Sequence, residues 1–452
     1  CGGSAKYFKE KQMKQINVGL LGCGTVGTGV AKILLENADL ISARVGARLN
    51  LARVADIDIT TDRGVFIPDG VWTIDAEAVV QDPQIDLIVE MIGGQGIAKE
   101  LILKAIANEK QIVTANKALL ASQGHDIFRA ALEKGVDVGF EASAGGCMPV
   151  IKTLRESLVG NRIQSITGIL NGTCNYILSK ITAEGVTFKE ALAEAKKKGY
   201  AEADSTLDVD GYDTAHKLAI LTSLSYGMVM NLNDIYVEGI SGITPGDIRF
   251  AEEFGYRIKL LAISKNNGDT IEARVHPTMI PFDNLLSSVN GAVNALMINA
   301  DAVENIMLYG YGAGMMPTGS AVVSDCVDLA RNLICGRSCR VPHLSYQMEN
   351  IRDIPITPID EITTRYYFRF SALDQPGVLS TISGILGDHG ISIKSVHQKG
   401  RKTNGSVPLV MLTHVAGEAA VQKALAEIRG LNVVSAKPVL IRIEDENAQD
   451  DE

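Results

Sequence analysis

The fold of this chain is decided by the stretch Ile16-Asn17-Val18-Gly19-Leu20-Leu21-Gly22-Cys23-Gly24-Thr25-Val26-Gly27. Its apolar first half predicts a buried parallel strand, and the residues that follow, 26–35, predict a helix. The pattern Gly22-x-Gly24-x-x-Gly27 in that context is typical of a dinucleotide-binding turn. Gly22 permits the tight turn, Gly24 lets the backbone approach a pyrophosphate, and Gly27 allows helix and strand to pack closely. The residues predicted to bind a cofactor here are Gly22, Gly24, Thr25, Val26 and Gly27.

Strand-like and helix-like runs alternate after this turn. We expect strands at 49–55, 87–92, 111–114 and 136–140, with helices at 97–108 and 126–133. Such alternation indicates an α/β fold with a Rossmann-type doubly wound sheet, in which ligands bind at the carboxyl ends of the strands. The segments expected at those ends are 93–94, 114–117 and 141–146.

The cofactor preference depends on the end of the second strand, where an acidic residue hydrogen-bonds the adenosine ribose. Asp56 stands there, although it lies further along the chain than the usual ~20 residues. It favours NAD over NADP, whereas Arg63 is the nearest downstream cation that could accept the additional phosphate of NADP. Lys117 is expected to end another strand at the ligand edge, as a solvated surface lysine or as a cation near the reacting carbonyl.

Composition excludes several classes of protein. The chain has 452 residues, enough for about two to four domains, and a formal net charge of −10 with 46% hydrophobic residues. Net negative charge argues against a dedicated nucleic-acid binder, and no uncharged apolar run reaches the ~20 residues of a membrane span. Seven cysteines without regular spacing do not indicate a disulfide framework. We expect a cytoplasmic protein whose natural start is Met13.

The pattern changes along the chain and predicts four parts. Residues 13–148 form the NAD(P)-binding domain. Residues 149–335 form an α+β substrate domain, of which 310–335 return to the first domain. Residues 336–362, with several prolines, form a linker. Residues 363–445 show the order βαββαβ of a ferredoxin-like domain, with its last strand at 433–443.

The residues from Gly199 to Lys217 carry most of the candidate chemistry. They include five carboxylates, and a helix is expected after Gly211. Asp213 and Lys217 are four residues apart and therefore share one helical face. An exposed ion pair of little energetic consequence is one interpretation. A lysine held by a carboxylate as proton donor to a developing alkoxide is the other. Cys147 follows two glycines, but no histidine partner for nucleophilic catalysis is evident.

At this point the sequence resembles the homoserine dehydrogenase family with a C-terminal ACT domain. The resemblance is carried by the glycine turn, by the segments 113–120, 141–146 and 168–178, and by the block 199–217. It implies reversible reduction of L-aspartate 4-semialdehyde to L-homoserine by NAD(P)H, on the route to threonine, methionine and isoleucine. Alternatives are an amino-acid sensor with a degenerate active site and an aspartate dehydrogenase, although the block 199–217 speaks against the latter.

The resemblance also implies roles for individual residues. Lys217 is the proton donor, and Asp213 orients it. Lys117 lines the junction of cofactor and substrate and counts as catalytic. Glu202, Asp208 and Asp213 bind the substrate. The further cofactor contacts are Thr114, Lys117, Gly199 and Gly312, besides Asp56.

Family members bind a monovalent cation, typically sodium. The matching ligands in this chain are Glu141 and the backbone carbonyls of Ala144, Gly146 and Met148. Two positions depart from the family pattern: Cys147 stands where glycine is common, and Tyr311 where proline is common.

The turn of the C-terminal domain resembles the ligand-binding turn of ACT domains. It consists of Asp374, Gln375, Pro376, Gly377 and Val378. The resemblance implies feedback inhibition, with L-threonine as the effector, and a homodimer or homotetramer. A dimerisation module without a ligand is the alternative.

Overall fold

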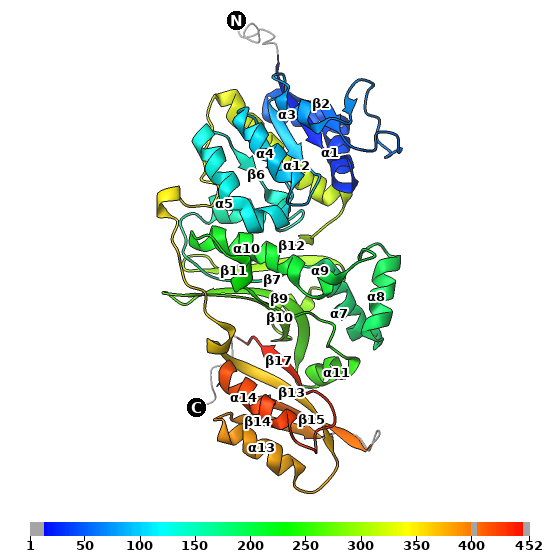
Figure 1. Ribbon diagram of the computed structural model, residues 1–452, viewed down its shortest axis with the longest axis vertical. Helices are drawn as coiled ribbons and strands as arrows, with labels where there is room; N and C mark the ends of the chain where they lie inside the picture. The colour runs from blue at the N-terminus through cyan, green and yellow to red at the C-terminus, as the bar shows by residue number, and fades with distance from the viewer. Residues whose placement is uncertain (1–12, 399–404, 446–452) are drawn as a thin grey trace, which may run out of the picture. The chain divides into compact units, whose positions relative to one another are not determined.

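The computed structural model describes residues 13–398 and 405–445 (Figure 1). The leader before Met13 lies outside them. The described chain forms two compact units. The first unit contains the residues up to Arg162, Ala219–Leu232 and Gly310–Asp353, and the second contains Ile163–Leu218, Asn233–Tyr309 and the chain from Ile354 onward. None of the helices in the described ranges has the length and apolar character needed to cross a membrane.

A parallel sheet organises the first unit. Its strand order is β3-β2-β1-β4-β5-β6, the order of a doubly wound dinucleotide-binding fold. The Rossmann-type prediction is therefore confirmed. The strands are β1 (Lys14–Leu21), β2 (Ala47–Ala55), β3 (Trp72–Thr73), β4 (Leu87–Glu90), β5 (Gln111–Thr114) and β6 (Val138–Gly139).

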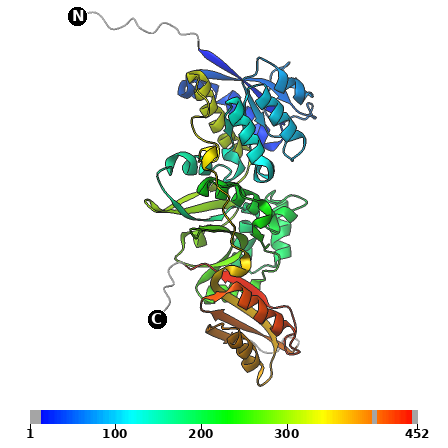
Figure 2. The same ribbon diagram turned by 60° about the vertical axis from the view of Figure 1, so that its left-hand side comes forward.

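Helices cover both faces of this sheet (Figures 1 and 2). On one face lie α1 (Thr25–Glu36), α2 (Ala38–Val45) and α12 (Met315–Cys335), and on the other lie α3 (Ala76–Gln81), α4 (Ile97–Ala107) and α5 (Lys117–Lys134). Val18 and Leu20 of β1 are buried with Val30 of α1 and Val322 of α12. The C-terminal half of the chain thus returns to complete the core of the N-terminal sheet.

The strand expected at 111–114 is present, but the placement of Lys117 at the end of a strand and the helix expected at 126–133 need correction. The strand β5 ends at Thr114, and α5 begins at Lys117. Asn116 caps this helix, because its Oδ1 accepts the N–H of Leu119 at 3.2 Å. Lys117 is therefore the first residue of a helix and does not end a strand.

A mixed sheet organises the second unit, in the order β12-β11-β7-β9-β10-β17-β13-β15-β14. The middle of the chain, which we call the catalytic part from its predicted role, contributes strands β7 to β12. They are β7 (Ile163–Ile169), β9 (Tyr256–Asn266), β10 (Ile271–Pro281), β11 (Val293–Ala300) and β12 (Glu304–Tyr311), and short β8 (Tyr236–Val237) pairs with β10. Its helices are α7 (Gly172–Glu184), α8 (Phe188–Lys197), α9 (Thr206–Val209), α10 (Tyr212–Tyr226) and α11 (Pro245–Glu253).

The C-terminal strands have the order β17-β13-β15-β14 of a ferredoxin-like sheet. They are β13 (Thr363–Leu373), β14 (Ile393–Gln398), β15 (Ser406–Thr413) and β17 (Val439–Ile443), with short β16 (Ala416–Gly417) beside β13. The helices α13 (Val378–Asp388) and α14 (Glu418–Arg429) lie side by side on this sheet (Figures 1 and 2). Phe368, Ile382 and Leu425 belong to their common core.

The last strand is shorter than expected. It begins at Val439 and not at residue 433. Pro438, directly before it, has no N–H to donate to a ladder, so regular pairing starts after the proline. Within the residues 433–438, the bridge between Ala372 and Val434 is isolated.

Candidate active site

The glycine turn has the geometry that its sequence predicts. Gly22 has φ +88°, and a Cβ built on it would lie 2.7 Å from the backbone carbonyl of Met91. A Cβ on Gly27 would lie 2.1 Å from the carbonyl oxygen of Gly22. A Cβ on Gly24, by contrast, would meet nothing within 4 Å. Two glycines are therefore required by packing, while the third leaves the start of α1 open to a phosphate.

Asp56 and Arg63 lie against this turn. The carboxylate of Asp56 accepts the N–H of Cys23 at 2.6 Å, and Nε of Arg63 donates to the carbonyl of Cys23 at 2.6 Å. The two side chains also form an ion pair at 3.4 Å, and the guanidinium lies over the ring of Trp72, 5.4 Å from its centroid. The loop between β2 and β3 thus brings an acid and a base together beside the turn.

Thr114 holds a carboxylate that the sequence prediction missed. Its hydroxyl donates to Oε2 of fully buried Glu90 at 2.7 Å. Oε1 of Glu90 accepts the N–H groups of Ile92 and Gly93 at 2.8 and 2.9 Å. Glu90 therefore fixes the loop after β4, and the position of an acid as the last residue of an apolar strand is the signal that could have found it.

Lys217 and Asp213 form a buried ion pair in the second unit. Nζ of Lys217 lies 2.8 Å from Oδ2 of Asp213, and each side chain is only 10% exposed. Nζ also donates to the carbonyl of Leu170 at 2.7 Å. The interpretation of this spacing as an exposed ion pair is therefore wrong. An ammonium group has three N–H donors, so the two acceptors leave one of them for a ligand.

Asn171 joins two predicted carboxylates, and sequence reasoning missed its role. Its Nδ2 donates to Asp208 at 2.8 Å and to Asp213 at 2.9 Å, while its Oδ1 accepts the N–H of Cys174 and caps α7. Asn294 donates to the same carbonyl of Leu170 that Lys217 uses, at 2.9 Å. The N-cap position of Asn171 before an apolar helix was a readable signal. The distant Asn294 offered none.

Glu202 and Gly199 are two further residues predicted to bind substrate and cofactor. The residue Glu202 is exposed, whereas Asp213 and Lys217 are buried. Gly199 follows α8 with φ +75° and open space around its Cα.

The loop 141–148 packs against the glycine-rich segment that contains Gly312. A Cβ on Gly146 would lie 2.4 Å from the Gly312 carbonyl, and the N–H of Cys147 donates to the carbonyl of Tyr311 at 3.1 Å. The predicted cation ligands Glu141, Ala144, Gly146 and Met148 are all buried.

Glu141 is a buried acid beside a second one. Its carboxylate accepts the N–H groups of Ile151 and Lys152, and its own N–H donates to Asp325 at 2.8 Å. Burial, and secondarily the charge of Asp325, raises the pKa of Glu141 to about 7, and burial raises the pKa of Asp325 to about 6. Two buried carboxylates and nearby carbonyl oxygens are hard donors that suit a small cation. No group of three His, Cys, Asp or Glu side chains within 13–398 and 405–445 could hold a metal by itself.

Comparison with known proteins decides the family. Family models match residues 149–327 (homoserine dehydrogenase), 22–141 (its NAD-binding domain) and 366–432 (ACT domain). The chain is 45% identical over 432 residues to the homoserine dehydrogenase of Neisseria gonorrhoeae, covering 96% of this chain and 99% of that protein. The chain belongs to the homoserine dehydrogenase family. The enzyme of Pseudomonas aeruginosa is also 45% identical, over 438 residues, with 96% of this chain and all of that protein covered. A homoserine dehydrogenase structure from Thiobacillus denitrificans matches with a TM-score of 0.90 and 46% identity over 96% of this chain and 99% of that one.

The predicted resemblance is thereby confirmed: the chain is an NAD(P)-dependent homoserine dehydrogenase of amino-acid biosynthesis with an ACT domain. In this homoserine dehydrogenase, the turn from Asp374 to Val378 connects β13 to α13. Gly377 caps α13 with φ +90°, and residues 374–377 are exposed. A small ligand can therefore reach the N-terminus of the helix from solvent.

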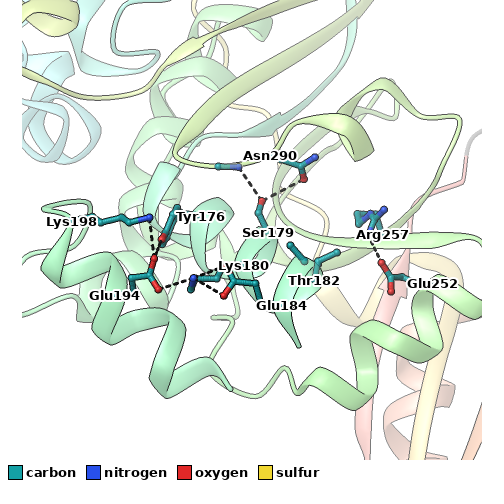
Figure 3. A pocket seen from close by; sticks show the side chains of 12 residues that line it. Tyr176, Ser179, Lys180, Thr182, Glu184, Glu194, Lys198, Glu252, Arg257 and Asn290 are labelled. Carbon is teal, nitrogen blue, oxygen red and sulfur yellow. Dashed lines mark hydrogen bonds and ion pairs between the residues drawn. The ribbon is translucent and has the colours of Figure 1, made fainter. Parts of the chain in front are cut away.

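A polar cavity of about 580 Å³ lies elsewhere in the second unit (Figure 3). Its charges are paired with one another. Lys180 lies between Glu184 and Glu194, and Arg257 pairs with Glu252 (Figure 3). None of the site residues predicted for the homoserine dehydrogenase lines it.

The bridge made by Asn171 gives a testable prediction. Asn171→Ser keeps an acceptor that caps α7 but removes the amide that donates to both aspartates. We expect kcat/KM for aspartate semialdehyde to fall roughly 10- to 100-fold, the equivalent of one hydrogen bond to a charged group. The midpoint of thermal unfolding should stay close to that of the wild type.

Asn284→Ser is the matched control, because Asn284 also caps a helical turn, at Leu286 N–H, outside this cluster. Steady-state kinetics of both variants show whether Asn171 acts on the two aspartates or only caps α7. Equal kcat/KM values for the two would show that Asn171 serves the helix alone.

Proposed function

We propose that this enzyme reversibly reduces L-aspartate 4-semialdehyde to L-homoserine with NAD(P)H, on the route to threonine, methionine and isoleucine. The supporting observation is the buried pair of Lys217 and Asp213, with Asn171 bridging to Asp208. Reduction of an aldehyde leaves an alkoxide that needs a proton, and a buried ammonium with a free N–H is suited to supply it.

The residues of this chain divide the work as follows. When bound, a reduced nicotinamide supplies the hydride. Nζ of Lys217 donates the proton to the alkoxide oxygen, while Asp213 orients the ammonium group. Asp208, Asp213 and Glu202 bind the substrate, whose ammonium group needs carboxylate partners. Lys117 adds a positive charge near the carbonyl.

Replacement of Lys217 tests this division. Lys217→Ala should lower kcat by at least ~10²-fold, because general-acid catalysis is lost, while the affinity for cofactor is retained. Cofactor affinity is measured by fluorescence titration of the folded variant. The control is Lys189→Ala, an exposed lysine on α8, which should keep the wild-type kcat.

Near-normal turnover of Lys217→Ala would remove Lys217 from its role. Wild-type protein that binds cofactor and amino acid but never oxidises NAD(P)H with aspartate semialdehyde would instead favour a sensor with a degenerate site.

We further propose that NAD is preferred over NADP. Asp56 lies against the glycine turn as an acid that suits ribose hydroxyls and repels a phosphate, while Arg63 is the cation within its reach. The expected result is a higher kcat/KM with NADH than with NADPH. In Arg63→Ala, the ratio of the two values should rise roughly tenfold, because the residual NADPH activity loses its phosphate partner.

An equal fall in kcat/KM with NADH and with NADPH in Arg63→Ala would contradict the assignment of Arg63 as a phosphate partner. It would mean that Arg63 acts only by holding the carbonyl of Cys23.

For Glu141, Ala144, Gly146 and Met148, we propose a sodium site. A cation would offset two buried acids, Glu141 and Asp325, and would hold the loop against Gly312. Exchange of sodium for choline at constant ionic strength should lower the midpoint of thermal unfolding as well as the activity. An unchanged midpoint would contradict the site.

For the ACT turn, Asp374 to Val378, we propose L-threonine as an inhibitor and a homodimer or homotetramer as the assembly. The exposed N-terminus of α13 behind Gly377 supports binding of a carboxylate. Inhibition by L-threonine that is lost in Gly377→Val would support the proposal, since a branched residue disfavours φ +90°. Light scattering measures the assembly.

A further inference from the structure

The ACT domain is built into the catalytic sheet. Its last strand, β17, pairs in parallel with β10, with Arg442 opposite Thr278 and Ile443 opposite Met279. Arg442 is among the largest fully buried side chains of the described residues. A buried guanidinium must find acceptors on every side, so its partners reveal what it holds together.

Arg442 has partners in both parts of the second unit. Within the ACT domain, Nε and Nη2 donate to Glu418 of α14 at 2.8 and 2.6 Å. In the catalytic part, Nη1 donates to Glu238 at 3.0 Å, and the guanidinium lies 4.8 Å from the ring centroid of Tyr236. The hydroxyl of Tyr236 also donates to Glu238 at 3.0 Å. Arg442 of the ACT domain therefore contacts both Tyr236 of β8 and Glu238, the residue that follows β8.

The segment after β8 lies directly on the catalytic block. The N–H of Ile240 donates to the carbonyl of Val209 at 2.9 Å. A Cβ on Gly239 would lie 2.4 Å from that same carbonyl, so the two backbones are in close contact. A Cβ on Gly211 would lie 3.1 Å from Val237. Glu238 itself is held to β10, because its N–H donates to the carbonyl of Val275 at 2.8 Å.

The turn that this segment contacts separates the two substrate carboxylates. Val209 ends α9, which carries Asp208, and Gly211 precedes α10, which carries Asp213 and Lys217. A shift of the turn would change the spacing between the two aspartates, which Asn171 spans with a single amide.

We infer that Arg442 and Glu238 are positioning residues that connect the ACT domain to the substrate carboxylates. The connection runs from Glu418 through Arg442 to Glu238, and from the backbone of Gly239 and Ile240 to the turn before α10. It rests on the proposed role of Asp208, Asp213 and Lys217. It assigns the ACT domain a part in forming the substrate site even when no effector is bound.

A second ion pair between the ACT domain and the catalytic part supplies the control. Arg369 of β13 donates to Asp247 of α11 at 2.6 and 3.1 Å. Tyr367 donates to the same carboxylate at 3.0 Å, so Asp247 keeps a donor when Arg369 is replaced. This pair attaches the ACT domain to α11 and not to β8.

The experiment compares Glu238→Ala with Arg369→Gln in the full-length enzyme. Each variant loses one ion pair between the ACT domain and the catalytic part. In Glu238→Ala, Arg442 remains paired with Glu418, so its buried charge keeps a partner and the variant is expected to fold. We expect Glu238→Ala to raise KM for aspartate semialdehyde roughly tenfold, with kcat and KM for the cofactor changed less than twofold. Arg369→Gln should change KM for the substrate less than twofold. Glu238→Gln, which keeps the oxygen acceptor, should recover most of the loss.

Thermal unfolding accompanies the kinetics and detects simple destabilisation. Equal substrate KM values for Glu238→Ala and Arg369→Gln would overturn the inference. So would a rise in substrate KM in Glu238→Ala that is just as large in Glu238→Gln. Absence of turnover in the wild type would instead reject the proposed function.

Threonine titrations add a second readout. In Glu238→Ala, L-threonine should still bind, as measured by calorimetry, but its inhibition should weaken several-fold, since a coupling free energy is lost. Full inhibition at unchanged concentration would count against the connection. If L-threonine does not inhibit the wild type, the proposed regulation fails, while the substrate KM still decides the positioning role.

Discussion

A buried ammonium group needs hydrogen-bond acceptors around it in the folded chain, and this constraint organises the residues around Lys217. Removing a charge from water costs several kcal/mol unless partners replace the lost hydration. Lys217 is almost enclosed, and its Nζ is met by Asp213 and by the carbonyl of Leu170. The carbonyl comes from the end of β7, so the ion pair fixes α10 to that strand as well as to itself.

Asn171 extends the same constraint to a third element. Its side chain caps α7 and at the same time gives both amide hydrogens to carboxylates on α9 and α10. A carboxylate that accepts such a bond is fixed in direction. The start of α7, the turn between α9 and α10, and the end of β7 are therefore held as one arrangement, which is what an enzyme needs around a substrate with both positive and negative groups.

How much of the fold and of the candidate site can be predicted from the sequence depends on how far apart the interacting residues lie along the chain. The glycine turn is local, and Gly22 and Gly27 have the conformations and contacts that their spacing predicts. The order of the ACT strands and helices also follows from local sequence patterns, although Pro438 shortens the last strand. The strands β9, β11 and β12 were not predicted, because an apolar run such as β9, buried on both faces, has no alternation to mark it as a strand. Asn171 was inside a quoted motif, yet its partners lie 37 and 42 residues away.

The pair of Asp213 and Lys217 shows why spacing alone does not assign a function. Four residues on a helix give the same pair whether the face is exposed, where it contributes a few tenths of a kcal/mol, or buried, where loss of one partner is costly. Lys217 reaches the carbonyl of Leu170 just after β7, and the sheet of β7 continues through β10 into β17 of the ACT domain. The same constraint applies to Arg442 in β17. Its guanidinium can be buried because it donates hydrogen bonds to Glu418 and Glu238. Lys217 thus holds the backbone just after β7, and Arg442 holds Glu238, next to the backbone that contacts the turn from Val209 to Gly211. The ACT domain and the turn between α9 and α10 are therefore joined through a continuous series of contacts, from Arg442 through Glu238 to the backbone of Ile240.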